Sequence, residues 1–433
     1  MNRSIATVLL VTILVSIAAC QPKDPEIEIK EVKRIISFLS SDDMEGRRAF
    51  TPGIEKASIF LQGEFEKIGL ETLDGLNNYE QRFEMFFLEI ESAELTINGN
   101  TIEDRNYFAV LDSRGIDWDQ NSGLRIEVIG SDGNIRDTFS ELSNTEDNVL
   151  VLVDKAHEQL FGRYKSFLSG PTYKMELKDS GNLVFILTGE INPKEYKINI
   201  MGNVSELSLS NIVGKISGKR SDEVVLFSAH YDHIGIRPSV EGDSIANGAN
   251  DDASGTTAVV SLAKYFSEME QPERTLIFVA FTAEEIGGYG SRYFSQAMDP
   301  DNIIAMFNIE MIGKGATEGP NTAWITGFEK SNFGKILQKA VDGTAYKFYA
   351  DPYPDQNLFY RSDNATLARL GVPAHSISTT PIDVDQDYHQ VSDEVETLDI
   401  DHMTNTIKAI AKAAATIVSG QETPSRVDPA DIN

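Results

Sequence analysis

The sequence predicts an α/β protein, in which a doubly wound, mainly parallel sheet carries a mainly β inserted domain. Three observations support this fold class. After residue 205, short apolar strands alternate with segments of helical periodicity, as in βαβ units. Several of these strands are apolar along their whole length, which is typical of buried parallel strands. Residues 81–204 show a different pattern, with short strands separated by turns rich in Gly and Asp.

The length and the charge narrow the possibilities further. A chain of 433 residues is too long for a single core, so a second domain is expected. The formal net charge is −29, from 38 basic and 67 acidic residues. Nucleic acid is therefore excluded as an expected partner, because phosphate contacts need clustered Lys and Arg. We interpret the acidity as a solvated surface.

Residues 1–20 have the features of an export signal rather than of the fold. Arg3 precedes an apolar stretch at residues 5–19, which is shorter than the roughly 20 residues of a membrane span. Small residues precede Cys20, the only cysteine, and this pattern resembles a bacterial lipobox. An ordinary signal peptide with an incidental cysteine is the alternative. We expect an exported protein that is lipid-anchored through Cys20 in the bacterial cell envelope.

Periodicity assigns the remaining elements. In residues 21–80, helices are expected at residues 27–41 and from Thr51-Pro52 to Gly69. The insertion at 81–204 should contain strands at 107–111, 125–129, 148–153 and 182–187. The main domain, 205–420, should contain strands at 211–216, 224–229, 275–282, 303–309, 322–326 and 372–377 and helices at 253–266, 291–297, 329–341 and 401–419. Residues 421–433, which contain Pro and Asp, are expected to be disordered.

Imidazole and carboxylate groups follow the ends of the predicted parallel strands. They are His230, Asp251, the pair Glu284-Glu285, Glu310 and His389. The carboxyl ends of parallel strands meet at one edge of a sheet, where ligands bind. Five such ligands could hold two divalent cations if one carboxylate bridges them. Two cations lower the pKa of a shared water, and the remaining carboxylate can then transfer its proton.

The same residues lie in motifs that resemble the secreted co-catalytic zinc aminopeptidases, metallopeptidase family 28. The motifs follow the family's order over about residues 27–80 and 205–420: His230-x-Asp232, Asn250-Asp251 with Gly255, Thr282-Ala-Glu284-Glu285, Asn308-Ile-Glu310-Met311 and Tyr388-His389. The resemblance implies a zinc exopeptidase fold, two zinc ions and peptides or protein N-termini as substrates. The insertion occupies the place where some members carry a protease-associated domain.

The resemblance also implies roles for single residues. His230, Asp251, Glu285, Glu310 and His389 would be zinc ligands, with Asp251 as the bridge. Glu284 would be the general base that activates a water held between the metals. Asp232 would orient His230, and Tyr388 would stabilise the tetrahedral intermediate.

Two positions depart from the family pattern, and several neighbours receive other interpretations. Position 310 is usually Asp, and His often stands where this chain has Asn364. We interpret His233 as a neighbour of the site rather than a ligand, and Asp252 as a helix cap. The acidic run at 383–387 is interpreted as a solvated loop, and the remaining histidines, His157, His375 and His402, as structural or solvated.

Other functions on this fold stay open. A carboxypeptidase or dipeptidase would need a basic residue for a free carboxylate, and Arg361, Arg237 and Arg292 are candidates. A glutaminyl cyclase usually uses one metal, which the complete ligand set disfavours. A non-catalytic receptor-like ectodomain would have lost ligands, and every ligand type is present here.

Overall fold

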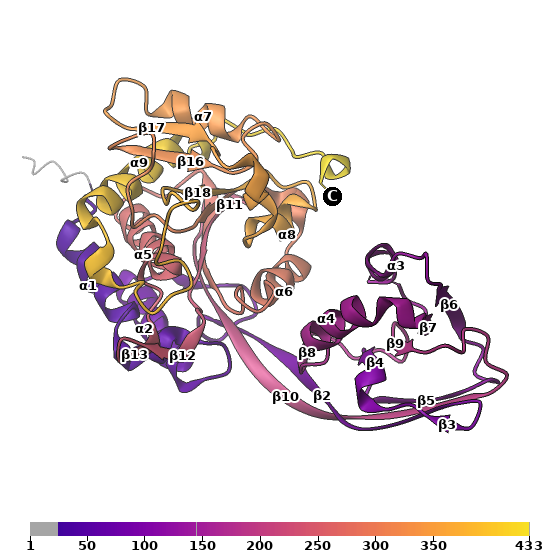
Figure 1. The fold of residues 1–433 in the computed structure, drawn as a ribbon. Coiled ribbons are helices and arrows are strands. Elements are labelled where there is room, and N and C mark those ends of the chain that lie inside the picture. The colour runs from indigo at the N-terminus through magenta and orange to yellow at the C-terminus, as the bar shows by residue number, and fades with distance from the viewer. Residues whose placement is uncertain (1–24, 144, 433) are drawn as a thin grey trace, which may run out of the picture.

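The computed structural model describes residues 25–143 and 145–432, so the predicted export signal with Cys20 lies outside it. Two lobes are joined by a long pair of strands (Figure 1). The larger lobe has a sheet between layers of helices, and the smaller lobe is the insertion. Within the described residues, none of the helices combines the length and apolarity that a membrane crossing needs.

The central sheet of the large lobe confirms the predicted fold class. Its parallel core consists of four adjacent strands in the order β18 (Ala374–Ser378), β15 (Ile303–Ile309), β11 (Arg220–His230) and β14 (Arg274–Phe281). Antiparallel strands flank this core: β10 (Tyr196–Ile216) pairs with β14, and β16 (Thr322–Ile325) pairs with β18. The edge strand β17 (Lys347–Ala350) is parallel to β16. The site-bearing strands therefore lie in the middle of the sheet, where both faces are covered.

Helices cover the two faces because the side chains of each strand alternate between them. On β11, Phe227 belongs to one core cluster and Leu226 to the other. The first cluster joins the sheet to α1 (Ile29–Leu39), α2 (Pro52–Ile68), α5 (Ser254–Ser267), α7 (Phe333–Ala340) and α9 (Ile400–Val418). The second joins it to α6 (Tyr289–Ala297) and α8 (Asn364–Ala368). The predicted helices of both layers are thus confirmed, with shifted ends.

The smaller lobe is mainly β, as predicted, but it also contains two helices. All four predicted strands form, as β4 (Tyr107–Val110), β6 (Arg125–Ile129), β7 (Val149–Val153) and β9 (Leu183–Leu187). Their sheet has the order β4-β9-β7-β6, and β6, β7 and β9 are parallel. Two unpredicted helices, α3 (Ile135–Leu142) and α4 (Glu158–Leu168), cover one of its faces. Helix α4 buries only Phe161, so its sequence has little apolar periodicity to reveal it.

The predicted domain boundaries at 81 and 204 fall inside continuous strands. β2 (Glu80–Ile97) and β10 pair antiparallel along their length, from Glu80 opposite Ile212 to Ile97 opposite Tyr196. One end of this ribbon extends the central sheet, and the other packs under the small sheet. The remaining strands are short: β1 (Glu71–Thr72), β3 (Asn100–Thr101), β5 (Gly115–Asp119), β8 (Thr172–Lys174), β12 (Gly235–Val240) and β13 (Asp243–Ala246).

The expectation of a disordered tail is wrong for residues 421–432. Val427 is buried, and its backbone N–H donates to the carbonyl of Gly371 at 3.1 Å. The guanidinium of Arg426 donates to the carbonyl of Ile303 at the start of β15. An apolar side chain and a cationic side chain thus help to hold a polar segment on the domain.

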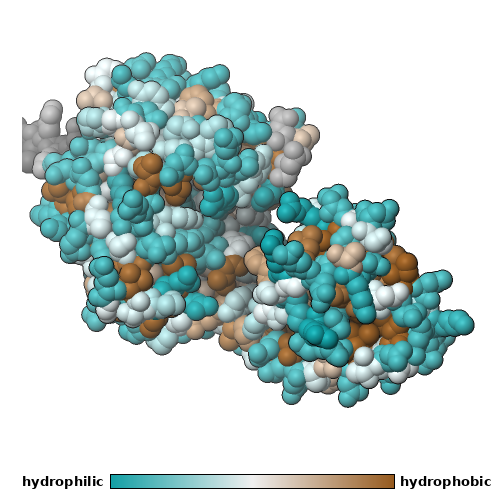
Figure 2. Space-filling view, viewed as in Figure 1, coloured by the Kyte–Doolittle hydropathy of each residue, from teal (hydrophilic) through white to brown (hydrophobic). Residues whose placement is uncertain are grey.

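The surface agrees with the interpretation of the net charge. The face in Figure 2 is mostly hydrophilic, and hydrophobic patches lie on both lobes. Exposed apolar side chains of the smaller lobe include Ile126, Val128 and Phe167.

Candidate metal site

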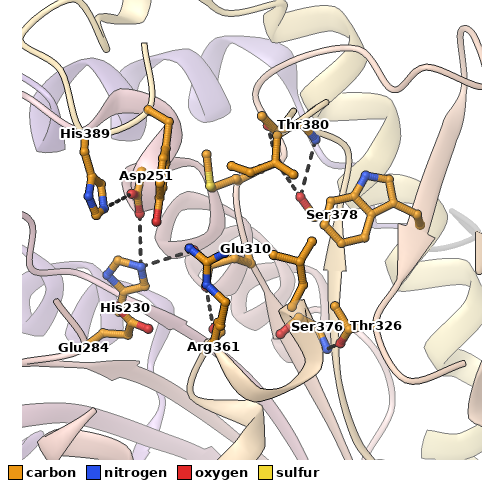
Figure 3. A pocket seen from close by; sticks show the side chains of 16 residues that line it. His230, Asp251, Glu284, Glu310, Thr326, Arg361, Ser376, Ser378, Thr380 and His389 are labelled. Atoms are coloured by element: carbon orange, nitrogen blue, oxygen red, sulfur yellow. Dashed lines mark hydrogen bonds and ion pairs between the residues drawn. The ribbon is translucent and has the colours of Figure 1, made fainter. Parts of the chain in front are cut away.

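The predicted ligands converge at the carboxyl edge of the parallel core (Figure 3). His230 is the last residue of β11, and Glu310 directly follows β15. Glu284 and Glu285 lie in the turn after β14. Ala283 and Met311, next to these acids, have positive φ angles of 58° and 52°, so the chain turns sharply where each strand ends.

Asp251 lies between two imidazoles. It comes from the turn Ala249–Ala253, directly before α5. Its Oδ1 is 3.2 Å from Nε2 of His230, and its Oδ2 is 3.2 Å from Nε2 of His389. Each imidazole has a second carboxylate: Glu310 Oε1 is 3.2 Å from His230, and Glu285 Oε2 is 3.1 Å from His389. All five predicted ligands are therefore brought together, with Asp251 in the bridging place.

The distances suit tetrahedral zinc. Zinc–nitrogen and zinc–oxygen bonds of about 2.0–2.1 Å place neighbouring ligand atoms about 3.3 Å apart. The other ring nitrogen of His230, Nδ1, is 3.1 Å from the backbone carbonyl of Asp232. A carbonyl only accepts hydrogen bonds, so Nδ1 carries the proton and Nε2 is left as the metal-binding atom. The donor atoms thus fit two zinc ions.

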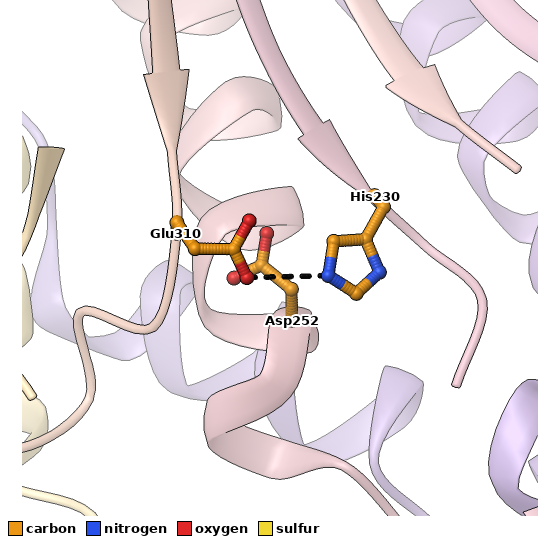
Figure 4. A group of neighbouring side chains, drawn as sticks. All are labelled: His230, Asp252 and Glu310. Carbon is orange, nitrogen blue, oxygen red and sulfur yellow. Dashed lines mark hydrogen bonds and ion pairs between the residues drawn. The ribbon is translucent and has the colours of Figure 1, made fainter. Parts of the chain in front are cut away.

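Two further residues approach the ligands. Asp252 lies with His230 and Glu310, with donor atoms within 4.8 Å of one another (Figure 4). Its Oδ1 accepts the backbone N–H groups of Gly255, in the first turn of α5, and of Met311. The predicted capping role is therefore confirmed, although its Oδ2 is buried and has no hydrogen-bond partner among the described residues.

His233 lies with Asp251 and Glu285, as Asp252 lies with His230 and Glu310. Its Nδ1 is 2.8 Å from Oε1 of Glu285, while Oε2 of that glutamate faces His389. The ring of His233 is fully buried. It is a neighbour that holds a predicted ligand, as expected from the sequence, although its own donor atom is also close enough to group with Asp251.

Asp232 holds the imidazole of His230 mainly through its backbone rather than through its carboxylate. Its Oδ1 is 3.7 Å from the imidazole, which instead contacts the Asp232 backbone carbonyl. The two carboxylate oxygens accept the backbone N–H groups of Glu284 and Glu285, at 3.1 and 3.3 Å. The physical reason is the tight turn after β14, which aims two adjacent N–H groups at one acceptor. Asp232 therefore positions the turn that carries both glutamates.

Glu284 lines the pocket beside the predicted ligands. Burial raises the pKa of its carboxyl well above the ordinary value for glutamate, and the nearby carboxylates of Asp363 and Glu310 act in the same direction. An elevated pKa suits a group that must take up a proton and release it again near neutral pH.

A chain of hydrogen bonds fixes Glu310. The hydroxyl of Ser362 donates to its Oε2 at 2.6 Å, and Asn308 donates to Ser362 at 2.7 Å. Asn308 also contacts Ser376, whose hydroxyl donates to Asn364 at 2.8 Å. The two residues that depart from the family pattern, Glu310 and Asn364, therefore belong to one hydrogen-bond network. Asn364 lies at its buried end, and Glu310 lies at the end that faces the metal site.

Residues 211–414 match the peptidase family M28. Over these residues, the chain belongs to this family. Curated relatives include a probable zinc metalloprotease of Pyrenophora tritici-repentis, 34% identical over 25% of this chain and 22% of its own length. Leucine aminopeptidase 1 of Trichophyton rubrum is 30% identical over 46% of this chain and 56% of its own. The chain thus spans about half the length of the leucine aminopeptidase and about a fifth of the length of the metalloprotease.

Solved structures show that the M28 fold extends over most of the chain. BSAP, a zinc aminopeptidase from Bacillus subtilis, aligns with a TM-score of 0.57 at 17% identity, covering 95% of this chain and 99% of that one. An aminopeptidase from Aneurinibacillus sp. strain AM-1 aligns with a TM-score of 0.53 at 18% identity, covering 90% and 94%. At these identities the likeness concerns the fold alone.

The M28 site of this chain contains one important residue that sequence reasoning missed. Arg47, in the segment between the two helices predicted for residues 21–80, is fully buried. Its guanidinium donates to the backbone carbonyls of Leu39, Tyr231, Asn247 and Gly248 at 2.6–2.9 Å. It thereby joins the segment after His230 to the loop before Asp251. The only sequence signal is an arginine beside glycine in a helix-connecting loop, which is too common to interpret.

The loop that carries Tyr388 and His389 is also more ordered than predicted. Lys314 pairs with both Asp385 and Asp387, and the Asp385 side chain is buried. The acidic run is therefore not simply a solvated loop, because two of its carboxylates anchor it to the M28 domain. His389 has a φ of 58°, and the Tyr388 ring stacks on its imidazole at 4.0 Å.

The pocket at the metal site is lined on one side by the predicted ligands and on the other by apolar side chains. The apolar wall consists of Met311, Trp324, Leu358 and Ile382. Tyr388 and Arg361 also line the pocket. Arg237 and Arg292, the other two basic candidates, do not: Arg237 lies on β12, and Arg292 packs over the ring of Tyr289.

Proposed function

We propose that this M28 peptidase is a zinc-dependent aminopeptidase that hydrolyses N-terminal peptide bonds. One observation carries the proposal: the two oxygens of Asp251 face two imidazoles, each with its own glutamate, while Glu284 is left over beside the pocket. A non-catalytic ectodomain has no need of such a spare carboxylate. The names of the relatives, a leucine aminopeptidase and a zinc aminopeptidase, support the same activity.

The two zinc ions would be held by His230, Asp251 and Glu310 on one side and by His389, Asp251 and Glu285 on the other. Zinc supplies Lewis acidity, which polarises a substrate carbonyl and lowers the pKa of water. Asp232 and Arg47 hold the segments that carry these ligands. His233 fixes one oxygen of Glu285, so the other is presented to the site.

Glu284 takes the proton of the attacking water and delivers it to the departing amine. Its burial favours this exchange, because a carboxylate in a low-dielectric site accepts a proton readily. Tyr388 donates a hydrogen bond to the oxygen of the tetrahedral intermediate. Burial raises the pKa of its phenol, so the hydroxyl keeps its proton at neutral pH.

The test is Glu284→Gln in the metal-loaded protein. The amide keeps the size of the side chain but cannot accept the proton, so kcat on an aminoacyl chromogenic substrate should fall by about 100-fold or more. Elemental analysis should still find close to two zinc ions per chain. Unchanged turnover would remove Glu284 as the base. No bound zinc and no activity in the unaltered protein would remove the proposed function.

We also propose that the peptidase is exported and anchored by a lipid on Cys20. The argument rests on the lipobox-like sequence, because these residues lie outside the described structure. Cys20→Ser should move the protein from the membrane fraction to the soluble fraction. Retention of the variant in membranes would contradict lipidation.

A further inference from the structure

The substrate pocket holds a cation that the metal chemistry leaves unused. The Arg361 side chain reaches into the pocket, near Glu310 and Ser376 in the view of Figure 3. It donates to Oε1 of Gln356 at 3.4 Å, a weak contact with a neutral group. Across the described ranges 25–143 and 145–432, no carboxylate lies within 4.0 Å of its guanidinium.

Chain connectivity places Arg361 beside the predicted metal site. Arg361 directly precedes Ser362, whose hydroxyl donates to the predicted ligand Glu310 at 2.6 Å. An anion held by Arg361 in the pocket would therefore belong to a residue close to the scissile carbonyl. The side chain of Arg361 is exposed and so accessible to a substrate, and guanidinium groups bind carboxylates through paired, charge-assisted hydrogen bonds.

We propose that Arg361 selects substrates that carry a carboxylate within one residue of the scissile bond. This inference rests on the proposed aminopeptidase function and narrows its substrate class. The carboxylate has two possible sources: an acidic side chain on the N-terminal residue, or the free C-terminus of a dipeptide.

Two matched substrate pairs distinguish these sources in the full-length, zinc-loaded protein. Glutamyl and glutaminyl p-nitroanilides differ only in the side-chain charge, and Leu-Gly and its C-terminal amide differ only in the terminal charge. We expect the charged member of one pair to have at least tenfold higher kcat/KM. The pair that shows the preference identifies the source.

Variants then assign the preference to Arg361. Arg361→Met should reduce the charged-to-neutral ratio of kcat/KM at least tenfold, and Arg361→Lys should restore part of it. Arg237→Met is the matched control, because Arg237 is exposed on β12 outside the pocket, and it should leave the ratio unchanged. An equal loss on both members of the pair would show a structural role and overturn the inference.

Calorimetry separates this inference from the proposed activity. Dissociation constants of both pairs can be measured with the zinc-loaded Glu284→Gln variant, in which turnover is blocked. Tighter binding of the charged member, lost on adding Arg361→Met, supports the carboxylate site even if the wild type hydrolyses nothing. Hydrolysis of all four substrates without a charge preference overturns the carboxylate site while the aminopeptidase function stands.

Discussion

Oδ1 of Asp232 accepts a hydrogen bond from the backbone N–H of Glu284 at 3.1 Å. Asp232→Asn leaves one acceptor oxygen where the turn presents two N–H groups, so the glutamates should lose their fixed orientation. We expect kcat to fall about 10- to 100-fold, the usual effect of removing such a supporting contact. Steady-state kinetics with zinc analysis checks this. Asp222→Asn, at the exposed start of β11, is the control. Full activity of Asp232→Asn would contradict the positioning role.

Asp251 should matter to both metals, and His389 to only one. His389→Ala removes a ligand from a single side, so the variant should keep close to one zinc per chain. Asp251→Ala removes one ligand from each side and should weaken both. Elemental analysis after dialysis against a limiting zinc concentration compares the two variants. Equal zinc contents would show that Asp251 does not bridge.

Arg47→Met should destabilise the fold although Arg47 contacts no predicted zinc ligand. The variant removes the guanidinium from the carbonyls of Leu39, Tyr231 and Asn247, while that of Gly248 keeps the backbone N–H of Ala253. Each buried carbonyl left without a partner costs about 1–3 kcal/mol unless it finds a new one. We expect the free energy of unfolding to fall by about 3 kcal/mol or more in urea titrations of the metal-free protein. The exposed neighbour Arg48 supplies the control, since Arg48→Met should change it by less than about 0.5 kcal/mol.

His375, which is not a predicted metal ligand, should make the stability depend on pH. Its Nδ1–H donates to the Thr326 carbonyl, and its Nε2 accepts from the Ser331 hydroxyl. Burial lowers the pKa of His375 to about 4, whereas an unfolded histidine has a pKa of about 6.5. Between these values the unfolded chain binds the extra proton. The contribution of neutral His375 to the free energy of unfolding is therefore fully present above about pH 6.5. About 3 kcal/mol of this free energy is lost as the pH falls towards 4.

His375→Gln isolates this effect because glutamine does not titrate. Urea unfolding of metal-free wild type and variant at pH 7 and pH 4.5 gives the comparison. The wild type should lose more stability than the variant over this range. Equal losses would mean that other groups cause the acid sensitivity.

The elements and ligands that follow from local pattern could be predicted. Both ends of strand β15 could be predicted, because five apolar residues open it and the acidic Glu310 directly follows its last residue. Arg47 could not be predicted, since its acceptors Tyr231 and Gly248 lie 184 and 201 residues away. The hydrogen bonds of the Asp232 carboxylate could not be predicted for a related reason. The sequence shows that Asp232 is close to His230, but it does not show that the turn at Glu284 and Glu285 donates two N–H groups to this carboxylate.

The order of residues 421–432 also depends on distant partners. The contacts of Arg426 and Val427 involve Ile303 and Gly371, and composition alone indicates only a polar segment. The lobe boundaries were misplaced because β2 and β10 continue through both lobes, and no change of pattern marks the passage.

The continuous β2–β10 ribbon also makes the smaller lobe separable by design. Met85 and Leu207 lie opposite each other on the ribbon, so a two-residue Asn-Gly link between them would close a hairpin. The residue pairs between this link and the central sheet would stay as they are. The excised part would include Tyr173, whose carbonyl accepts the Tyr289 hydroxyl at the start of α6. Such a truncated enzyme would show whether the lobe governs access for long substrates, because small chromogenic substrates would not depend on it.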